Sequence, residues 1–123
     1  KYEYGISHED MCELFSRSKI SLNFSKNMTL TPPKRQIKAR LFEVPAGNAL
    51  LCTEETPNLE EYYKIDEEVV TFSSPLELYE KCSYLLKNQN VLKRMSQNGF
   101  NRFKKEHESK QRLPKILDKI MKL

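Results

Sequence analysis

The spacing of apolar and polar residues predicts that helices and strands alternate along the first third of the chain. A first helix begins after Ser7, which can act as its N-cap, and ends near Ser18. Residues 20–24 alternate apolar and polar side chains, which is typical of a short strand. The polar stretch 25–33 follows and closes on two prolines, so it predicts a loop that leads into the next helix.

The central part of the chain joins a helix to a buried strand through one glycine. Apolar residues recur at helical spacing over 36–46, and Gly47 can take the left-handed conformation that ends a helix. The apolar run 49–52 then predicts a buried strand. The other face of the helix carries Arg40 and Glu43. This polar face can therefore line a cleft.

The second half of the chain predicts one short helix, one strand and three longer helices: 59–63, 68–72, 75–87, 91–105 and 111–123. The clearest helix start is at Pro75, which suits a first helical position. Ser74 can cap this helix, and Glu77 completes a capping box. Pro114 fits the last helix only near its start.

This order of elements predicts an α/β domain with a parallel sheet of about three strands, flanking helices and a helical C-terminal tail. The 123 residues fit one domain. Because parallel strands need neighbours on both edges, we expect further strands upstream in a longer protein, or a homodimer formed through the open sheet edge.

The net charge of +4 hides a division along the chain. Residues 54–80 contain nine acidic residues and one lysine, whereas residues 87–123 contain eleven basic residues and three acidic ones. The basic helical tail predicts either a solvated surface or contact with phosphates, anionic lipid or an acidic partner. We do not expect nucleic-acid binding, because the tail lacks interleaved aromatic residues in a recognisable motif.

No apolar run is long enough to span a bilayer and no signal peptide is visible, so we expect a cytoplasmic protein, with peripheral membrane contact through the basic C-terminal helices as an alternative. Cys12, Cys52 and Cys82 are too far apart for a disulfide framework or a zinc site, and we expect them to be small buried residues. His8 and His107 are expected to be solvent-exposed.

Candidate binding residues follow two of the predicted strands and precede the central helix. Ligands in open α/β sheets bind at the carboxyl ends of the strands. Asn23 and Ser25 follow the first strand, and residues 53–55, with Thr53 first, follow the second. Lys34 and Arg35 are expected near the N-terminus of the central helix, where basic residues could meet an anion.

Several segments resemble group 1 glycosyltransferases, in particular the branch related to spore maturation proteins, and match the second half of their C-terminal domain. The segments are Tyr4-Gly5, 18–25, 38–47 and 67–78. The resemblance implies a B-type glycosyltransferase fold, in which two Rossmann-like domains face each other across a cleft. Residues 1–123 would then be part of the C-terminal domain, which binds the nucleotide-sugar, and the partner would be an N-terminal domain of the same protein.

The resemblance also implies roles for individual residues. Glu43 stands where the family has the second glutamate of a Glu-x7-Glu motif, whose carboxylate accepts hydrogen bonds from the donor ribose. The position eight residues earlier holds Arg35, so the first glutamate is absent. Arg40, Lys34 or Arg35 could instead neutralise the donor diphosphate, whose negative charge grows as the glycosidic bond breaks. No metal or other cofactor is expected.

The predicted activity is transfer of a sugar from a nucleotide-sugar to a glycan, a protein or a lipid-linked acceptor, with cell-surface polysaccharide as an expected context. The fragment alone is expected to be inactive, because half of the cleft is missing. The alternative is a non-catalytic α/β interaction module that kept the fold and lost donor binding, and Arg35 in place of the first glutamate is the feature that favours it.

Overall fold

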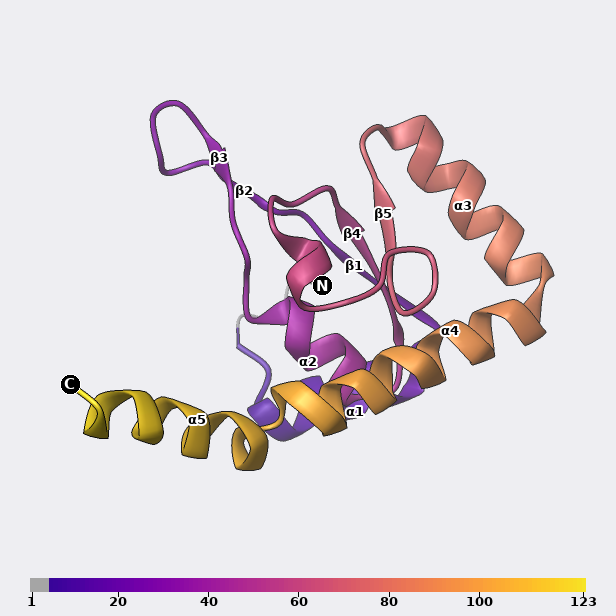
Figure 1. Ribbon diagram of the computed structural model, residues 1–123. Coiled ribbons are helices and arrows are strands. Elements are labelled where there is room, and N and C mark those ends of the chain that lie inside the picture. The colour runs from indigo at the N-terminus through magenta and orange to yellow at the C-terminus, as the bar shows by residue number, and fades with distance from the viewer. Residues whose placement is uncertain (1–4) are drawn as a thin grey trace.

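A computed structural model describes residues 5–123, so Tyr4 lies outside the described residues. Within this range, three parallel strands form a sheet in the order β1–β4–β5 (Figure 1). Their bounds are Ile20–Asn23 (β1), Leu50–Glu54 (β4) and Val70–Phe72 (β5). The predicted α/β class, with a partial Rossmann-like parallel sheet, flanking helices and a helical C-terminal tail, is confirmed.

Helices cover both faces of this sheet. Their bounds are His8–Arg17 (α1), Arg40–Ala46 (α2), Pro75–Lys87 (α3), Gln89–Arg102 (α4) and Ser109–Met121 (α5), with a 3-10 turn at Leu59–Glu61 (η1) and a π-helical turn at Phe103–His107 (η2). α2 and η1 contribute to the core on one face, and α3 and α4 to the core on the other.

Strand β4 is the centre of the fold, because its side chains enter two cores. Leu51 packs with the apolar side chains of α2 and with Tyr63. Leu50 and Cys52 point to the other face, where they pack with residues of α3 and α4. All residues from Leu50 to Thr53 are fully buried. The apolar run in the sequence therefore marks a strand that is covered on both faces, as is usual in parallel sheets.

A β-hairpin replaces the loop and helix start that the sequence predicts after β1. Lys26–Asn27 (β2) pairs antiparallel with Lys34–Arg35 (β3). The Gln36 N–H donates to the carbonyl of Ser25, so the extended pairing continues past β3. For this reason α2 begins at Arg40 and not at Gln36. The expectation that Lys34 and Arg35 lie at the helix N-terminus is wrong, because both lie in the hairpin.

The turn after α2 differs from the prediction in one residue. Gly47 has φ −83° and ψ 2°, whereas Asn48 takes the left-handed conformation with φ 61°. Gly47 is needed for space instead, because a Cβ there would lie 2.8 Å from the Cβ of Phe15 on α1. The glycine therefore allows α1 to lie against the end of α2.

The start of α3 is capped as predicted, but its glutamate bonds one residue earlier. The Ser74 hydroxyl accepts a hydrogen bond from the Glu77 N–H at 3.2 Å. The Glu77 carboxylate accepts from the N–H and hydroxyl of Ser73 and pairs with Lys81 at 2.7 Å, so the reciprocal bond of a capping box does not form. The bond from Lys81, followed by those from Ser73, lowers the pKa of Glu77 to about 2.

The C-terminal helices begin earlier than predicted, at Gln89 and Ser109, and the π-helical turn η2 separates them. Pro114 lies in the second turn of α5, two residues further into the helix than expected, because the helix begins at Ser109. In Figure 1, α5 extends away from the rest of the fold toward the C-terminus.

The expectations for cysteine and histidine hold in part. Cys52 is buried, and burial raises the pKa of its thiol to about 12. Cys82 is half-buried, but Cys12 is exposed on α1, so the prediction for Cys12 is wrong. His8 is exposed as expected. His107 is half-buried, because its ring packs among Phe42, Tyr62 and Tyr63.

Candidate functional site

Side chains at the carboxyl ends of β1 and β4 meet, as the parallel arrangement predicts. The Asn23 side-chain amide donates a hydrogen bond of 3.0 Å to the Thr53 hydroxyl. That hydroxyl donates in turn to the carbonyl of Glu54 at 3.1 Å. Asn23 is 3% exposed and Thr53 is fully buried. The structure thus brings two predicted binding residues together, and their polar groups form hydrogen bonds within the protein.

Glu54 fixes the loop that follows β1. Its Oε2 accepts hydrogen bonds from the N–H and hydroxyl of Ser25, at 3.0 and 3.1 Å, and from the N–H of Lys26 at 3.3 Å. Arg35 lies 3.7 Å from its Oε1. Partial burial opposes ionisation of Glu54, but these hydrogen bonds and the charge of Arg35 outweigh it and lower the pKa below the ordinary value. Glu54 is therefore a charged anchor between the two strand ends.

Arg35 is held between two carboxylates. Besides Glu54 it pairs with Glu55 at 3.8 Å, and its side chain is 32% exposed. It lines a hollow of about 360 Å³ at this end of the sheet, together with Glu55, Thr56 and Glu60. The charge of Arg35 is already balanced by these carboxylates. An anion that entered the hollow would also be repelled by them. The neighbouring Lys34 is exposed, and it has no ion pair among the described residues.

Lys38 joins the segment before α2 to the loop after β1. Its Nζ donates to the carbonyl of Phe24 at 2.7 Å and to that of Lys26 at 3.1 Å. Because Arg40 begins α2 two residues later, the start of this helix is held near the carboxyl end of β1. This role of Lys38 could not be predicted from the sequence, since the contact depends on the path of the hairpin and leaves no local pattern.

Glu43 lines a hollow of about 390 Å³ between α1, α2 and the start of α5. His8 and Cys12 from α1 and Ser109 from α5 lie around the same hollow. Glu43 is half-buried. Among residues 5–123 its carboxylate has no hydrogen bond or ion pair, and the alternative pairing with Arg40 three residues earlier does not form. The carboxylate therefore has an open acceptor capacity in a concave place.

The six predicted binding residues thus fall into two groups. The strand ends and the hairpin hold Asn23, Thr53, Lys34 and Arg35, and the helix α2 holds Arg40 and Glu43. Glu54 and Lys38 connect the strand ends to the hairpin and to the helix start.

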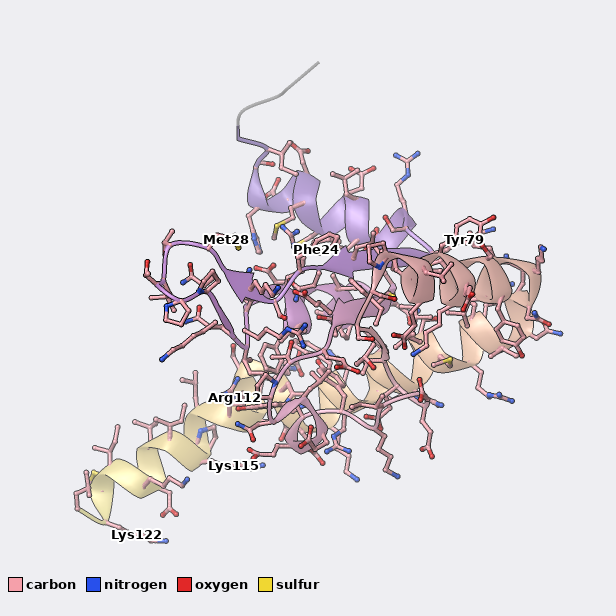
Figure 2. The ribbon with its side chains drawn as sticks, turned by 90° about the horizontal axis from the view of Figure 1, so that it is seen from above. Phe24, Met28, Tyr79, Arg112, Lys115 and Lys122 are labelled. Atoms are coloured by element: carbon pink, nitrogen blue, oxygen red, sulfur yellow. The ribbon has the colours of Figure 1, made fainter. Side chains whose placement is uncertain are left out.

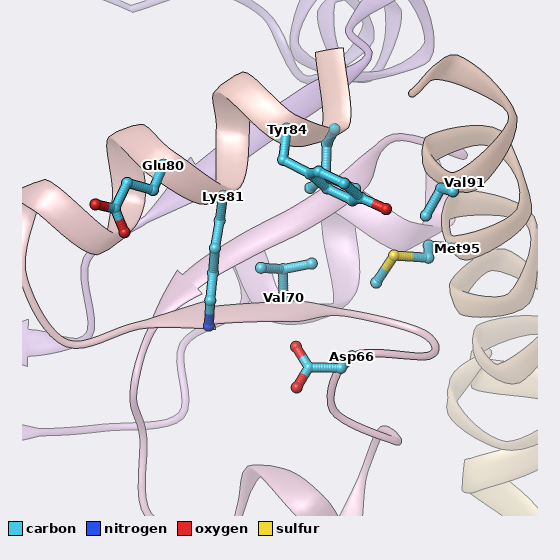
Figure 3. A pocket seen from close by; sticks show the side chains of 8 residues that line it. Asp66, Val70, Glu80, Lys81, Tyr84, Val91 and Met95 are labelled. Carbon is cyan, nitrogen blue, oxygen red and sulfur yellow. The ribbon is translucent and has the colours of Figure 1, made fainter. Parts of the chain in front are cut away.

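A further hollow of about 340 Å³ lies beside β5 (Figure 3), and none of the six predicted binding residues lines it. Its wall is mainly apolar and includes Val70, Leu85, Val91 and Met95. Lys81 stands at its edge, but its Nζ donates to the carbonyl of Thr71 at 2.6 Å and pairs with a carboxylate of α3. This lysine closes the outer edge of β5 and is not available to a ligand.

Residues 5–123 bring together no group of three or more His, Cys, Asp or Glu side chains that could hold a metal ion. In the same range, no helix combines the length and the apolar character that crossing a bilayer requires.

Comparison with known proteins gives one result. The chain matches a family described as glycosyl transferase-like over residues 1–118. The searches of curated proteins and of solved structures gave no match. The family match covers nearly the whole chain and includes both groups of candidate residues. The chain therefore belongs to the glycosyl transferase-like family.

Proposed function

We propose that this chain is the donor-binding portion of a glycosyltransferase that moves a sugar from a nucleotide-sugar to a glycan, a protein or a lipid-linked acceptor. Family membership supports glycosyl transfer in general. The observation that supports a donor site concerns Glu43. Its half-buried carboxylate lines a hollow and has no partner among the described residues.

The chemistry of Glu43 suits a sugar ring. An ionised carboxylate only accepts hydrogen bonds, and its two oxygens can take two neighbouring hydroxyl donors at once. In this proposal Glu43 accepts the hydroxyls of the donor ribose. Arg40 is exposed on the first turn of the same helix and would face the diphosphate. A cation there stabilises the negative charge that develops on the leaving nucleoside diphosphate.

In this proposal Arg35 does not bind the donor diphosphate, which is the role considered from the sequence. Its guanidinium is held by Glu54 and Glu55, so it fixes the hairpin at the end of the sheet. A second Rossmann-like domain, supplied by another part of the protein, would close the cleft and carry the acceptor. Residues 1–123 alone would then have no transferase activity, and activity of this fragment would contradict the two-domain view.

Calorimetric titration of the full-length protein with uridine, guanosine and adenosine diphosphates tests the donor site. Wild type is expected to bind one of them, and Glu43→Gln to bind it at least about tenfold more weakly, because the substitution removes the charge that strengthens the hydrogen bonds to the ligand. Glu61→Gln, which removes an exposed carboxylate on η1, is the matched control and should bind like wild type.

The alternative is an interaction module that kept the fold without donor binding. Failure of the wild type to bind any of the nucleoside diphosphates would favour the module. Equal binding by wild type and Glu43→Gln would mean that a donor site exists but that Glu43 does not contribute to it.

A further inference from the structure

The apolar hollow of about 340 Å³ beside β5 lies among side chains of α3 and α4 (Figure 3). We call it the β5 hollow. Its apolar wall consists of Val70, Leu85, Val91 and Met95. All of these except Val91 are no more than 6% exposed, and they belong to the core on this face of the sheet. Small organic ligands bind in hollows of this size with mainly apolar walls, so the β5 hollow has the form of a ligand site.

The outer edge of β5 is already closed, so the β5 hollow is not a place for a further strand. The Val69 carbonyl accepts a hydrogen bond from the Asp66 N–H at 2.7 Å. The Thr71 carbonyl accepts one from the Nζ of Lys81 at 2.6 Å. A strand from a second copy of the chain would have to displace these bonds before it could pair with β5. The occupant of the hollow is therefore a molecule that contacts side chains and leaves the backbone of β5 as it is.

The β5 hollow is separate from the proposed donor site. Glu43 belongs to α2, which packs on the other face of the sheet. Phe24, directly after β1, is 59% exposed at the carboxyl ends of the strands (Figure 2), where the second domain of the proposed enzyme would cover it. Asp66 instead precedes β5, and Leu85 and Val91 belong to the end of α3 and the start of α4. A domain that closes over the carboxyl ends would therefore leave the hollow open.

The polar residues around the β5 hollow leave negative charge without a partner. Among the described residues, Lys81 is the only basic one that lines the hollow, and its Nζ pairs with Glu77 at 2.7 Å. Asp66 and Glu80 also line the hollow, and within residues 5–123 neither carboxylate has a hydrogen bond or an ion pair. Figure 3 shows the Asp66 carboxylate directed toward Val70 and Lys81. The hollow therefore combines an apolar wall with carboxylates that can accept hydrogen bonds.

We propose that the β5 hollow binds a small organic amine, with the apolar body of the ligand against the apolar wall and its ammonium group against the Asp66 carboxylate. Burial of the apolar body removes apolar surface from water. The ammonium group donates a charge-assisted hydrogen bond to the carboxylate, and Glu80 adds a second negative charge nearby. An organic anion would be repelled by these two carboxylates, and a neutral molecule of the same shape would gain only the burial.

Three probes with the same apolar ring test the proposal: cyclohexylmethylamine, cyclohexylmethanol and cyclohexanecarboxylate. At neutral pH they are a cation, a neutral molecule and an anion. Each is titrated into the full-length protein, and the chemical shifts of the methyl groups of Val70, Leu85 and Met95 are followed. The amine is expected to bind at least about tenfold more strongly than the carboxylate, with the alcohol between them. The methyl groups of the apolar wall should show the largest changes.

Asp66→Asn separates the charge from the shape of the hollow. This variant should bind the amine about tenfold more weakly and the alcohol like wild type, because the amide keeps the shape of the carboxylate but carries no charge. Asp66 has φ 66°, a left-handed conformation that asparagine also adopts readily, so the variant should fold like wild type. Glu67→Gln is the matched control, since it removes a neighbouring exposed carboxylate that does not line the hollow, and it should bind the amine like wild type.

Four results would each overturn the proposal. The amine could fail to bind, the carboxylate could bind as strongly as the amine, or Asp66→Asn could bind the amine like wild type. The fourth is that the amine changes the shifts of residues around the Glu43 hollow and not those of the β5 hollow. None of these results depends on the binding of nucleoside diphosphates, so this proposal and the proposed donor site can fail independently.

Discussion

The Asn23 amide donates to the Thr53 hydroxyl at 3.0 Å, and this buried bond joins the carboxyl ends of two parallel strands that are 30 residues apart in sequence. Both side chains lie where an open α/β sheet binds ligands, yet each satisfies the other. The bond therefore fixes the register of β1 against β4 and the position of the loops that follow.

Thr53→Val should destabilise the protein. The substitution keeps the shape of the side chain but leaves the buried Asn23 amide without its acceptor, which costs about 1 to 3 kcal/mol in the free energy of unfolding. Urea unfolding followed by circular dichroism measures the change. A double variant with Asn23→Leu added should lose less than the sum of the two single variants, because the unpaired group is then gone. Simple additivity would show that the bond contributes nothing.

Glu54→Gln should reduce stability at neutral pH by about 1 to 3 kcal/mol, because the hydrogen bonds from Ser25 and the pair with Arg35 lose their charge. The pKa of Glu54 is lower in the folded than in the unfolded state. Its stabilisation is therefore complete above the unfolded-state pKa of 4.5 and is lost as the pH falls through the folded-state pKa.

Urea unfolding of wild type and Glu54→Gln at a series of pH values tests this dependence. The two stability curves should converge as the pH falls through the folded-state pKa of Glu54, because the carboxylate is then protonated in the folded protein as well. Glu55→Gln is the control, since its side chain is 54% exposed and should contribute less. A constant difference between wild type and Glu54→Gln down to low pH would exclude the charge as the cause.

The sequence predicted those elements whose signals are local. The Ser7 and Ser74 caps and the apolar run of β4 need only neighbouring residues to form, and all three appear in the structure. The hairpin of β2 and β3 was missed, because each strand has only two residues, both polar, and therefore shows no alternation of apolar and polar side chains. The packing of His107 against Tyr62 could not be predicted either, because the two residues are 45 positions apart.

For the candidate site, too, the sequence predicted local features but not contacts between separate elements. Helical spacing places Glu43 on the polar face of α2, and the structure gives it an open hollow. The sequence could not reveal that Arg35 is held by Glu54 and Glu55, since the β2–β3 hairpin brings them together. Residue type alone therefore identified the charges at the site but not which of them are already paired.

Gly47→Ala should destabilise the packing of α1 on α2. The added Cβ would lie 2.8 Å from the Cβ of Phe15 and 3.3 Å from the backbone of α1, so one helix must move. Such overpacking costs about 1 to 3 kcal/mol. Thermal unfolding should show a lower Tm. The contrasting change is Asn48→Gly, which removes a side chain from a left-handed residue and should leave the Tm unchanged or slightly higher. A neutral Gly47→Ala would mean that α1 adjusts freely.

His107→Ala should destabilise the protein by about 1 to 3 kcal/mol, because it empties a place among Phe42, Tyr62 and Tyr63 and removes the hydrogen bond between Nε2 and the Tyr62 carbonyl. Burial lowers the pKa of His107 in the folded state, because it outweighs the opposing effect of the hydrogen bond to the Tyr62 carbonyl. The unfolded chain therefore takes up the proton first, and this part of the stability is lost as the pH falls below about 6.5.

Chemical-shift titration of the two histidines checks the direction of this shift. The His107 ring should titrate at lower pH than it does in the urea-unfolded chain, and the free energy of unfolding of wild type should fall more steeply between about pH 7 and pH 5 than that of His107→Ala. His8→Ala, on the exposed face of α1, should keep the wild-type slope. If His107 titrated at higher pH when folded, the Tyr62 carbonyl would outweigh burial, and stability would instead rise on acidification over this range.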